Sequence, residues 1–168
     1  MLNEKQKVAE LKKTLEKNKN LQQYLFRRGF LISTNKEVDL DAFPFYGNWN
    51  STELKAFKFY THKDTGLHYI EKENRVYFLL GHAYNPFTME ISEEKILEKI
   101  ASAYDTDKYY DAINEITGVF AYGVLSDNEI EYITEPSGMQ SFNYGKIKEN
   151  FYLTSHIQIL GDILGLKI

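Results

Sequence analysis

The sequence predicts an α+β fold in which two β-sheets pack against each other and helices cover them. Three observations support this prediction. Strand-like runs lie on both sides of a central pair of helical segments, which favours layered sheets and helices. Aromatic residues make up 15% of the chain, and this composition fits strands better than a helical bundle. The hydrophobic share of 43% over 168 residues is sufficient for one packed domain.

The first 25 residues are predicted to form an amphipathic helix. Their leucines and valine are mostly three, four or six positions apart, and lysine and glutamate occupy the other faces. Gly29 follows two arginines and ends the pattern, because glycine interrupts helices. We therefore divide the chain into an N-terminal amphipathic helix over residues 1–27 and a main domain over residues 28–168. The helix either packs on the main domain or binds a partner.

The first half of the main domain is predicted to consist of strands and one long ordered loop. Residues 30–33 form a short apolar run that predicts a buried strand. Residues 34–53 mix turn formers with aromatic side chains, which is typical of an ordered loop over a core. Further strands are predicted over residues 56–61, 67–72 and 75–80, with turns at residues 64–66 and 73–74. Residues 81–86 are expected to leave the strand as a loop.

The second half is predicted to begin with two helices and to continue with strands. Ser92 is placed as an N-cap, with Glu93 and Glu94 in the favourable first turn of a helix that runs to Tyr104. A second helix is predicted over residues 106–116. Strands are predicted over residues 119–125, 129–134 and 151–154, with a further short strand between Gly138 and Gly145. Ser155 is expected to cap a last helix that ends at Gly165.

Composition excludes several classes of function. The net charge is −4 and no basic stripe is present, which argues against binding to nucleic acid. No apolar run reaches the ~18–20 residues that a membrane span needs, and no secretory signal begins the chain. We therefore expect a soluble cytoplasmic protein. The absence of cysteine rules out disulfides, a thiolate zinc site and a cysteine nucleophile.

A search for catalytic and ligand-binding motifs gives no match to a phosphate loop, a dinucleotide-binding loop or a paired-histidine zinc motif. No cofactor and no metal are therefore expected. The four histidines are interpreted as solvated residues at strand ends, although His62 and His68 could approach each other across a turn. Ser155 and His156 would point to opposite faces of a strand, so their adjacency does not make them a nucleophile and its base.

Three segments in order resemble class II glutamine amidotransferase domains, as found at the front of asparagine synthetases. Residues 78–85 (FLLGHAYN) resemble the family segment F-N-G-E-I-Y-N. Residues 116–127 (ITGVFAYGVLSD) are similar to the family strand L-x-G-x-F-A-F-A-I-x-D. Residues 132–145 place Gly138, Tyr144 and Gly145 in step with L-A-R-D-x-x-G-x-x-P-L-Y-Y-G, and residues 153–157 (LTSHI) resemble F-A-S-E-I. The resemblance covers roughly residues 75–166.

The resemblance implies the N-terminal-nucleophile hydrolase fold, a four-layer αββα sandwich, here with an added N-terminal helix. Members of the family hydrolyse glutamine with an N-terminal cysteine whose own α-amino group acts as the base. Ammonia then passes to a second domain, where ATP activates the acceptor. The ATP-pyrophosphatase motif of that second domain, S-G-G-x-D-S, does not occur in this sequence.

The chemical positions of the family pattern are those from which this chain departs. Leu80 aligns with the asparagine that helps to hold the oxyanion, while the neighbouring glycine is kept as Gly81. His82 aligns with the substrate-side glutamate, and Ser92 or Glu93 lies near the position of a substrate-binding aspartate. We therefore expect no catalytic residue at the degenerate positions Leu80, Gly81 and His82. Gly81, His82, Ser92 and Glu93 are the candidates for residual substrate binding.

Three functions are compatible with these features. The leading hypothesis is a degenerate, non-catalytic glutaminase-like domain that scaffolds or regulates an asparagine-synthetase-like amide-forming enzyme. Its partner would be an ATP-pyrophosphatase synthetase domain in cis or in trans, and a homodimer is possible. The second is an active small-amide hydrolase that uses His82 with Ser137 or Ser155. The third is an unrelated interaction module that uses the N-terminal helix and the aromatic loop at residues 43–49, which contains Phe43, Phe45, Tyr46 and Trp49.

Overall fold

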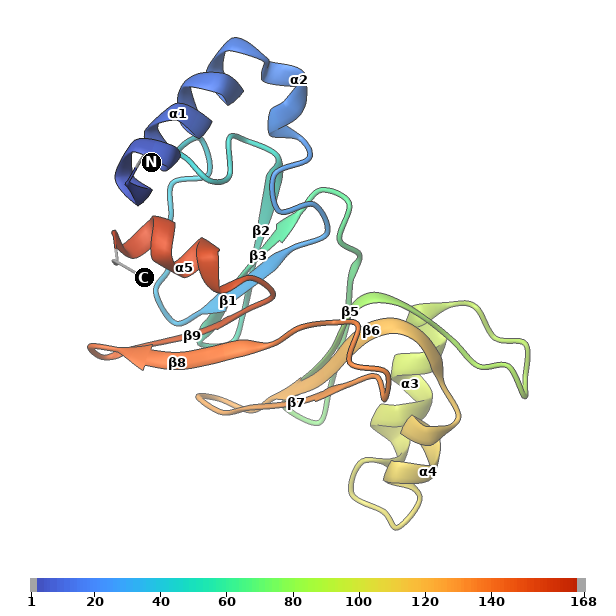
Figure 1. The fold of residues 1–168 in the computed structure, drawn as a ribbon. Coiled ribbons are helices and arrows are strands. Elements are labelled where there is room, and N and C mark those ends of the chain that lie inside the picture. Colours follow the sequence, from blue (N-terminus) through green and yellow to red (C-terminus); the bar gives the residue numbers. More distant parts are fainter. Residues whose placement is uncertain (1–2, 166–168) are drawn as a thin grey trace.

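A computed structural model describes residues 3–165, which form two antiparallel sheets and five helices (Figure 1). The helices are α1 (Glu4–Lys17), α2 (Lys19–Gln22), α3 (Glu93–Ala103), α4 (Tyr109–Asn114) and α5 (Ile157–Leu164). The strands are β1 (Phe30–Ser33), β2 (Trp49–Leu54), β3 (Phe57–His62), β4 (Leu67–Lys72), β5 (Arg75–Tyr84), β6 (Thr117–Leu125), β7 (Ile130–Thr134), β8 (Asn143–Ile147) and β9 (Asn150–Thr154). The predicted α+β class is confirmed.

The two sheets take their strands from different parts of the chain. The four-stranded sheet has the order β4-β5-β6-β7, and the helices α3 and α4 lie in the connection between its two central strands. The five-stranded sheet has the order β2-β3-β1-β9-β8, so strands from both ends of the chain meet in it. Its strand β1 pairs with β3 on one side and with β9 on the other. Within the described residues, no helix has the length and apolar character required to cross a membrane.

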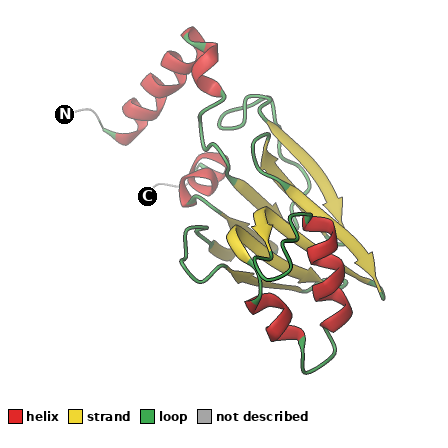
Figure 2. Ribbon diagram, turned by 90° about the vertical axis from the view of Figure 1, so that its right-hand side faces the viewer, coloured by secondary structure: helices red, strands yellow, loops and turns green. Residues whose placement is uncertain are grey.

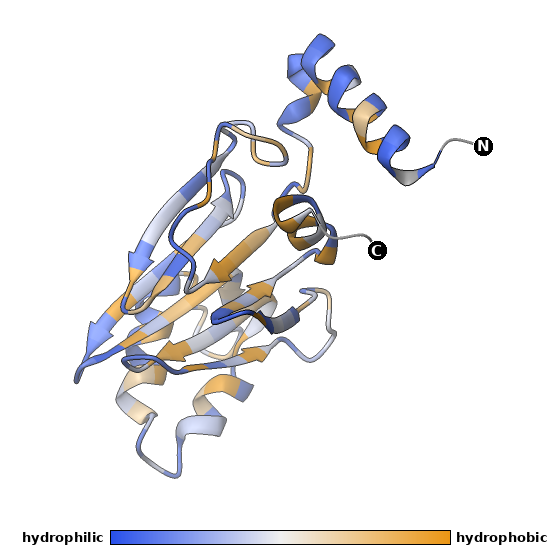
Figure 3. Ribbon diagram, turned by 90° about the vertical axis from the view of Figure 1, so that its left-hand side faces the viewer, coloured by the Kyte–Doolittle hydropathy of each residue, from blue (hydrophilic) through white to orange (hydrophobic). Residues whose placement is uncertain are grey.

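Three hydrophobic cores hold these elements together. The first lies between the sheets and contains Phe59 and Phe78, whose side chains are both 0% exposed. The second joins the other face of the four-stranded sheet to α3 and α4, which Figure 2 shows lying beside the strands. The third packs α5 and the aromatic loop at residues 43–49 on the outer face of the five-stranded sheet. Hydrophobic residues accordingly run along the central strands and α5 in Figure 3.

The N-terminal region departs from the predicted single helix. α1 ends at Lys17, because Asn18 caps it through its backbone and side-chain N–H groups, both of which donate to the carbonyl of Thr14. Leu15 is buried, whereas Leu11 and Leu21 remain more than 40% exposed. Figures 2 and 3 show α1 standing away from the two sheets. The predicted contribution of Leu2 lies outside the described residues.

Most of the other differences from the sequence predictions have a common cause, which is pairing between strands. The loop predicted over residues 34–53 ends early, because every residue from Trp49 to Leu54 pairs with β3 and so forms β2. β5 continues past Leu80 to Tyr84, where it pairs with the start of β6. Gly145 lies within β8 and does not bound it. The second helix is shorter than predicted, since residues 106–108 form a turn before α4.

Several local predictions are confirmed. The short buried strand at residues 30–33 and the hairpin of β4 and β5 occur as expected. Ser92 caps α3 by accepting a hydrogen bond from the N–H of Lys95 (3.4 Å). Gly165 ends α5 in a left-handed conformation with φ of 60°.

Candidate functional site

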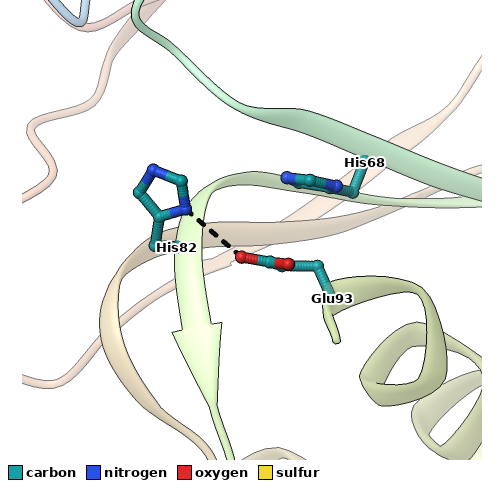
Figure 4. Close-up of side chains that lie close together, drawn as sticks. All are labelled: His68, His82 and Glu93. Carbon is teal, nitrogen blue, oxygen red and sulfur yellow. Dashed lines mark hydrogen bonds and ion pairs between the residues drawn. The ribbon is translucent and has the colours of Figure 1, made fainter. Parts of the chain in front are cut away.

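His68, His82 and Glu93 form a cluster at one end of the four-stranded sheet (Figure 4). One potential ligand atom from each side chain lies within 4.8 Å of the other two. His82 Nδ1 is 3.2 Å from Glu93 Oε1, and this contact is the only one of the three drawn as a bond in Figure 4. The arrangement brings two imidazoles and a carboxylate together.

Three separate elements position the cluster. His68 lies on β4, where it pairs with Leu79 of β5, and His82 lies further along β5. Glu93 is the first residue of α3, and the cap at Ser92 fixes the start of that helix. Because β4, β5 and α3 contact one another extensively, the three side chains are held to a common corner of the domain.

Gly81 precedes His82 and adopts φ of +97°, a conformation that other residues rarely take. A Cβ at this position would lie 2.3 Å from the carbonyl oxygen of Val119 on β6. Glycine at position 81 is therefore explained by the close approach of the paired β5 and β6 backbones, which leaves no room for a side chain.

The environment of the cluster favours an ionised carboxylate. Partial burial opposes ionisation of Glu93, but its own backbone N–H and the His82 side chain hold the pKa of the carboxyl below its ordinary value. The Nε2 atom of His68 is buried and has no hydrogen-bond partner among the described residues. An unpartnered buried nitrogen costs free energy, so this imidazole has a binding capacity that the protein itself does not use.

The predicted site residues fall into two groups. His82 and Glu93 lie in contact, with Nδ1 and Oε1 3.2 Å apart. Leu80 is 1% exposed in the core between the sheets, and Ser92 serves as the helix cap. His68 was not associated with them from the sequence. The available signal was the β4–β5 hairpin, whose register places His68 near the end of the strand that carries His82.

His62 does not match its interpretation as a solvated residue. It is 0% exposed and lies on β3 of the five-stranded sheet, whereas His68 belongs to the other sheet. The N–H of Asp64 donates to His62 Nδ1 (3.0 Å), so Nε2 carries the proton and donates to the carbonyl of Gln23 (2.9 Å). Neutral His62 thereby ties the segment after α2 to the sheet.

Acidification is expected to destabilise the protein through His62. Burial lowers the pKa of His62 below its usual value, and burial does the same for His156. A histidine whose pKa is lower in the folded than in the unfolded protein contributes fully to stability at pH values above its unfolded pKa of about 6.5. That contribution is lost as the pH falls towards the pKa of the folded state. Urea unfolding between pH 7.5 and 5.5 should therefore show a falling free energy of unfolding. The His62→Gln variant should show a shallower fall, and an equally steep fall in that variant would contradict the assignment.

Ser155 and Ser137 are each bonded within their own segments. Ser155 Oγ accepts the N–H of Phe30 (2.9 Å) and lies 2.8 Å from His156 Nδ1, so it joins the end of β9 to the start of β1. It is not the cap of α5, because His156 occupies the N-cap position, and the His156 side chain accepts no hydrogen bond from the first turn of that helix. Ser137 bonds to Glu135. Among the described residues, neither serine is hydrogen-bonded to His82.

The aromatic loop at residues 43–49 divides between core and surface. Phe45 and Trp49 are 1% and 4% exposed, and they pack with α5 on the five-stranded sheet. Phe43 and Tyr46 are half-buried, and Lys12 of α1 lies over the Phe43 ring at 4.7 Å. Half of the aromatic surface proposed for an interaction module is therefore core.

Comparisons with protein-family models, with curated proteins and with solved structures gave no match for this chain.

Proposed function

We propose that this chain is a non-catalytic relative of class II glutaminase domains that scaffolds or regulates an amide-forming synthetase. The sequence resemblance over residues 75–166 motivates the proposal. The single observation that carries it concerns Phe30, the first residue of β1. The family chemistry would need an N-terminal nucleophile with a free amine at the start of this strand, and Phe30 provides neither.

The order of the layers supports the proposal. The helix pair α3 and α4, the four-stranded sheet, the five-stranded sheet and α5 follow one another through three successive cores. The same order is expected of the αββα sandwich of N-terminal-nucleophile hydrolases. The segments that carry the resemblance supply the interior strands β5, β6 and β9 and parts of the edge strands β7 and β8.

The head of β1 lacks every group that the family chemistry requires. Phe30 has no nucleophilic atom, and its nitrogen is a peptide N–H that donates to Ser155 Oγ (2.9 Å). A peptide nitrogen has no basic lone pair, so it cannot take a proton as a free α-amino group does. The position is also closed, because Phe30 is 0% exposed.

The oxyanion position is equally unsuited to catalysis. The side chain of Leu80 has no hydrogen-bond donor, and it contributes to the hydrophobic core between the sheets. Loss of one oxyanion donor typically costs about 10²–10³ in rate. What remains of the family pattern is therefore the part that packs and turns the chain.

A glutamine hydrolysis assay on the purified full chain tests the absence of catalysis. We expect no release of ammonia above that of a heat-unfolded control, because both the nucleophile and the oxyanion donor are missing. A fluorophosphonate probe should likewise leave Ser155 unlabelled, since its hydroxyl is buried and already bonded. Ammonia release that disappears in the Ser155→Ala variant, or labelling of Ser155, would contradict the proposal.

The scaffolding role makes a separate prediction about the partner. Cross-linking in the source cells should recover a polypeptide that carries the S-G-G-x-D-S motif, either attached to this chain or separate from it. Amide formation by that synthetase should then change when this chain is removed. A synthetase whose rate and stability are indifferent to this chain would count against the scaffolding role.

A further inference from the structure

We propose that His68, His82 and Glu93 form a binding site for a divalent transition-metal ion of the zinc class. Two imidazoles and one carboxylate are a ligand set that Zn²⁺ accepts, with a fourth position left for water or another ligand. The site is independent of the proposed glutaminase-like function, because it rests on the geometry of these three side chains alone.

The spacing of the cluster fits an ion with little rearrangement. Two ligand atoms that each bind Zn²⁺ at about 2.1 Å with a tetrahedral angle lie about 3.4 Å apart. His82 Nδ1 and Glu93 Oε1 are already 3.2 Å apart. The remaining separations, which reach at most 4.8 Å, must close by about 1.4 Å or less to reach that tetrahedral spacing.

The three ligands differ in how freely they can adjust to an ion. The His82 side chain is 75% exposed, so it can rotate without loss of packing. The Glu93 side chain is 18% exposed and His68 is half-buried, which leaves two better-fixed ligands to receive the ion. A site with two held ligands and one adjustable ligand loses less side-chain entropy on binding than one built from three free side chains.

His68 supplies the second, independent observation. Its Nε2 is buried without a hydrogen-bond partner among residues 3–165. Coordination through Nε2 would give this nitrogen the partner it lacks and recover the cost of its desolvation. Glu93 contributes a carboxylate, which supplies the negative charge that a cation needs.

A bound ion would join three elements that follow one another along the chain. It would connect β4, β5 and the first turn of α3, and so lock the helix to the sheet. Because the unfolded chain does not hold these ligands together, binding free energy would add to the free energy of unfolding.

Titration with zinc chloride tests the site, with chelator-treated, untagged full chain and isothermal calorimetry. We expect one ion per chain. The variants His82→Gln and Glu93→Gln should each weaken zinc binding by roughly a hundredfold, because loss of a direct ligand should cost as much as the largest effects of losing a residue that only orients a ligand. Co²⁺ in place of Zn²⁺ should give the intense visible absorption of a four-coordinate ion. The midpoint of thermal unfolding should rise with zinc in the wild type and rise much less in His82→Gln at the same zinc concentration.

Two matched controls separate this site from adventitious binding. Glu94→Gln removes the same charge from the same helical turn at a side chain outside the cluster, and His156→Gln removes a histidine outside the cluster. Both should bind zinc as the wild type does. Absence of saturable binding, or equal weakening in the controls and the cluster variants, would overturn the proposal. Since His82 is exposed, its variant is expected to fold, which circular dichroism would verify.

Discussion

Gly81→Val is expected to lower the free energy of unfolding by at least about 3 kcal/mol, because two steric costs coincide at this position. The residue adopts φ of +97°, which a β-branched residue cannot take without strain. A Cβ would also lie 2.3 Å from the carbonyl oxygen of Val119, and that oxygen belongs to the β5–β6 pairing and cannot retreat freely. Urea unfolding followed by the fluorescence of Trp49, the single tryptophan, would measure the loss.

Gly145→Ala is the matched control for this prediction. Gly145 also lies in a strand, but its φ is not positive and no atom lies within 4 Å of the position that an added Cβ would take. We expect a change within about 0.5 kcal/mol there. Equal losses in the two variants would show that the close approach at Gly81 carries no special cost. The expected effect also means that Gly81 substitutions report on folding and are unsuitable as tests of catalysis.

Phe59→Ala and Phe78→Ala are each expected to cost about 3–5 kcal/mol. Phe59 comes from the five-stranded sheet and Phe78 from the four-stranded sheet, and both side chains are 0% exposed. Their rings meet edge to face with centroids 4.9 Å apart, so each truncation opens a cavity in the layer that joins the sheets. Denaturant unfolding of the single variants would measure these costs.

The double variant distinguishes a direct contact from general loss of hydrophobic area. A coupling of about 0.5–1.5 kcal/mol between the two rings is expected beyond area burial. Phe87→Ala is the control, because Phe87 is 77% exposed and should change stability little. Strict additivity of the two core variants would contradict direct packing between the sheets at this point.

Local patterns in the sequence were sufficient for much of the fold. The polar turn at Glu73 and Asn74 between two strand-like runs predicted the β4–β5 hairpin. Ser92, followed by two glutamates, predicted the start of α3, because an N-cap and acidic first-turn residues act within one helical turn. Such features depend on neighbours only a few residues away, so they can be read without tertiary information.

Other features depended on contacts that the local sequence pattern does not reveal. Residues 50–52 are polar and gave no strand pattern, yet they form part of β2 because β3 offers a free edge. His62 carries no mark of burial in its local sequence, and only the carbonyl of Gln23 and the N–H of Asp64 explain its place in the core. Of the candidate cluster, the sequence named His82 and Glu93 only as candidates for residual substrate binding, and it did not join His68 to them.

The sequence by itself determined the α+β class, most strand positions and the lack of any cysteine nucleophile, since these follow from composition and short-range periodicity. Tertiary structure alone decided that Leu80 lies in the hydrophobic core between the sheets, that the nitrogen of Phe30 is bonded to Ser155, and that two histidines meet a glutamate. The physical reason is that side-chain chemistry depends on through-space neighbours, and strand register and helix docking bring these neighbours together from remote parts of the chain.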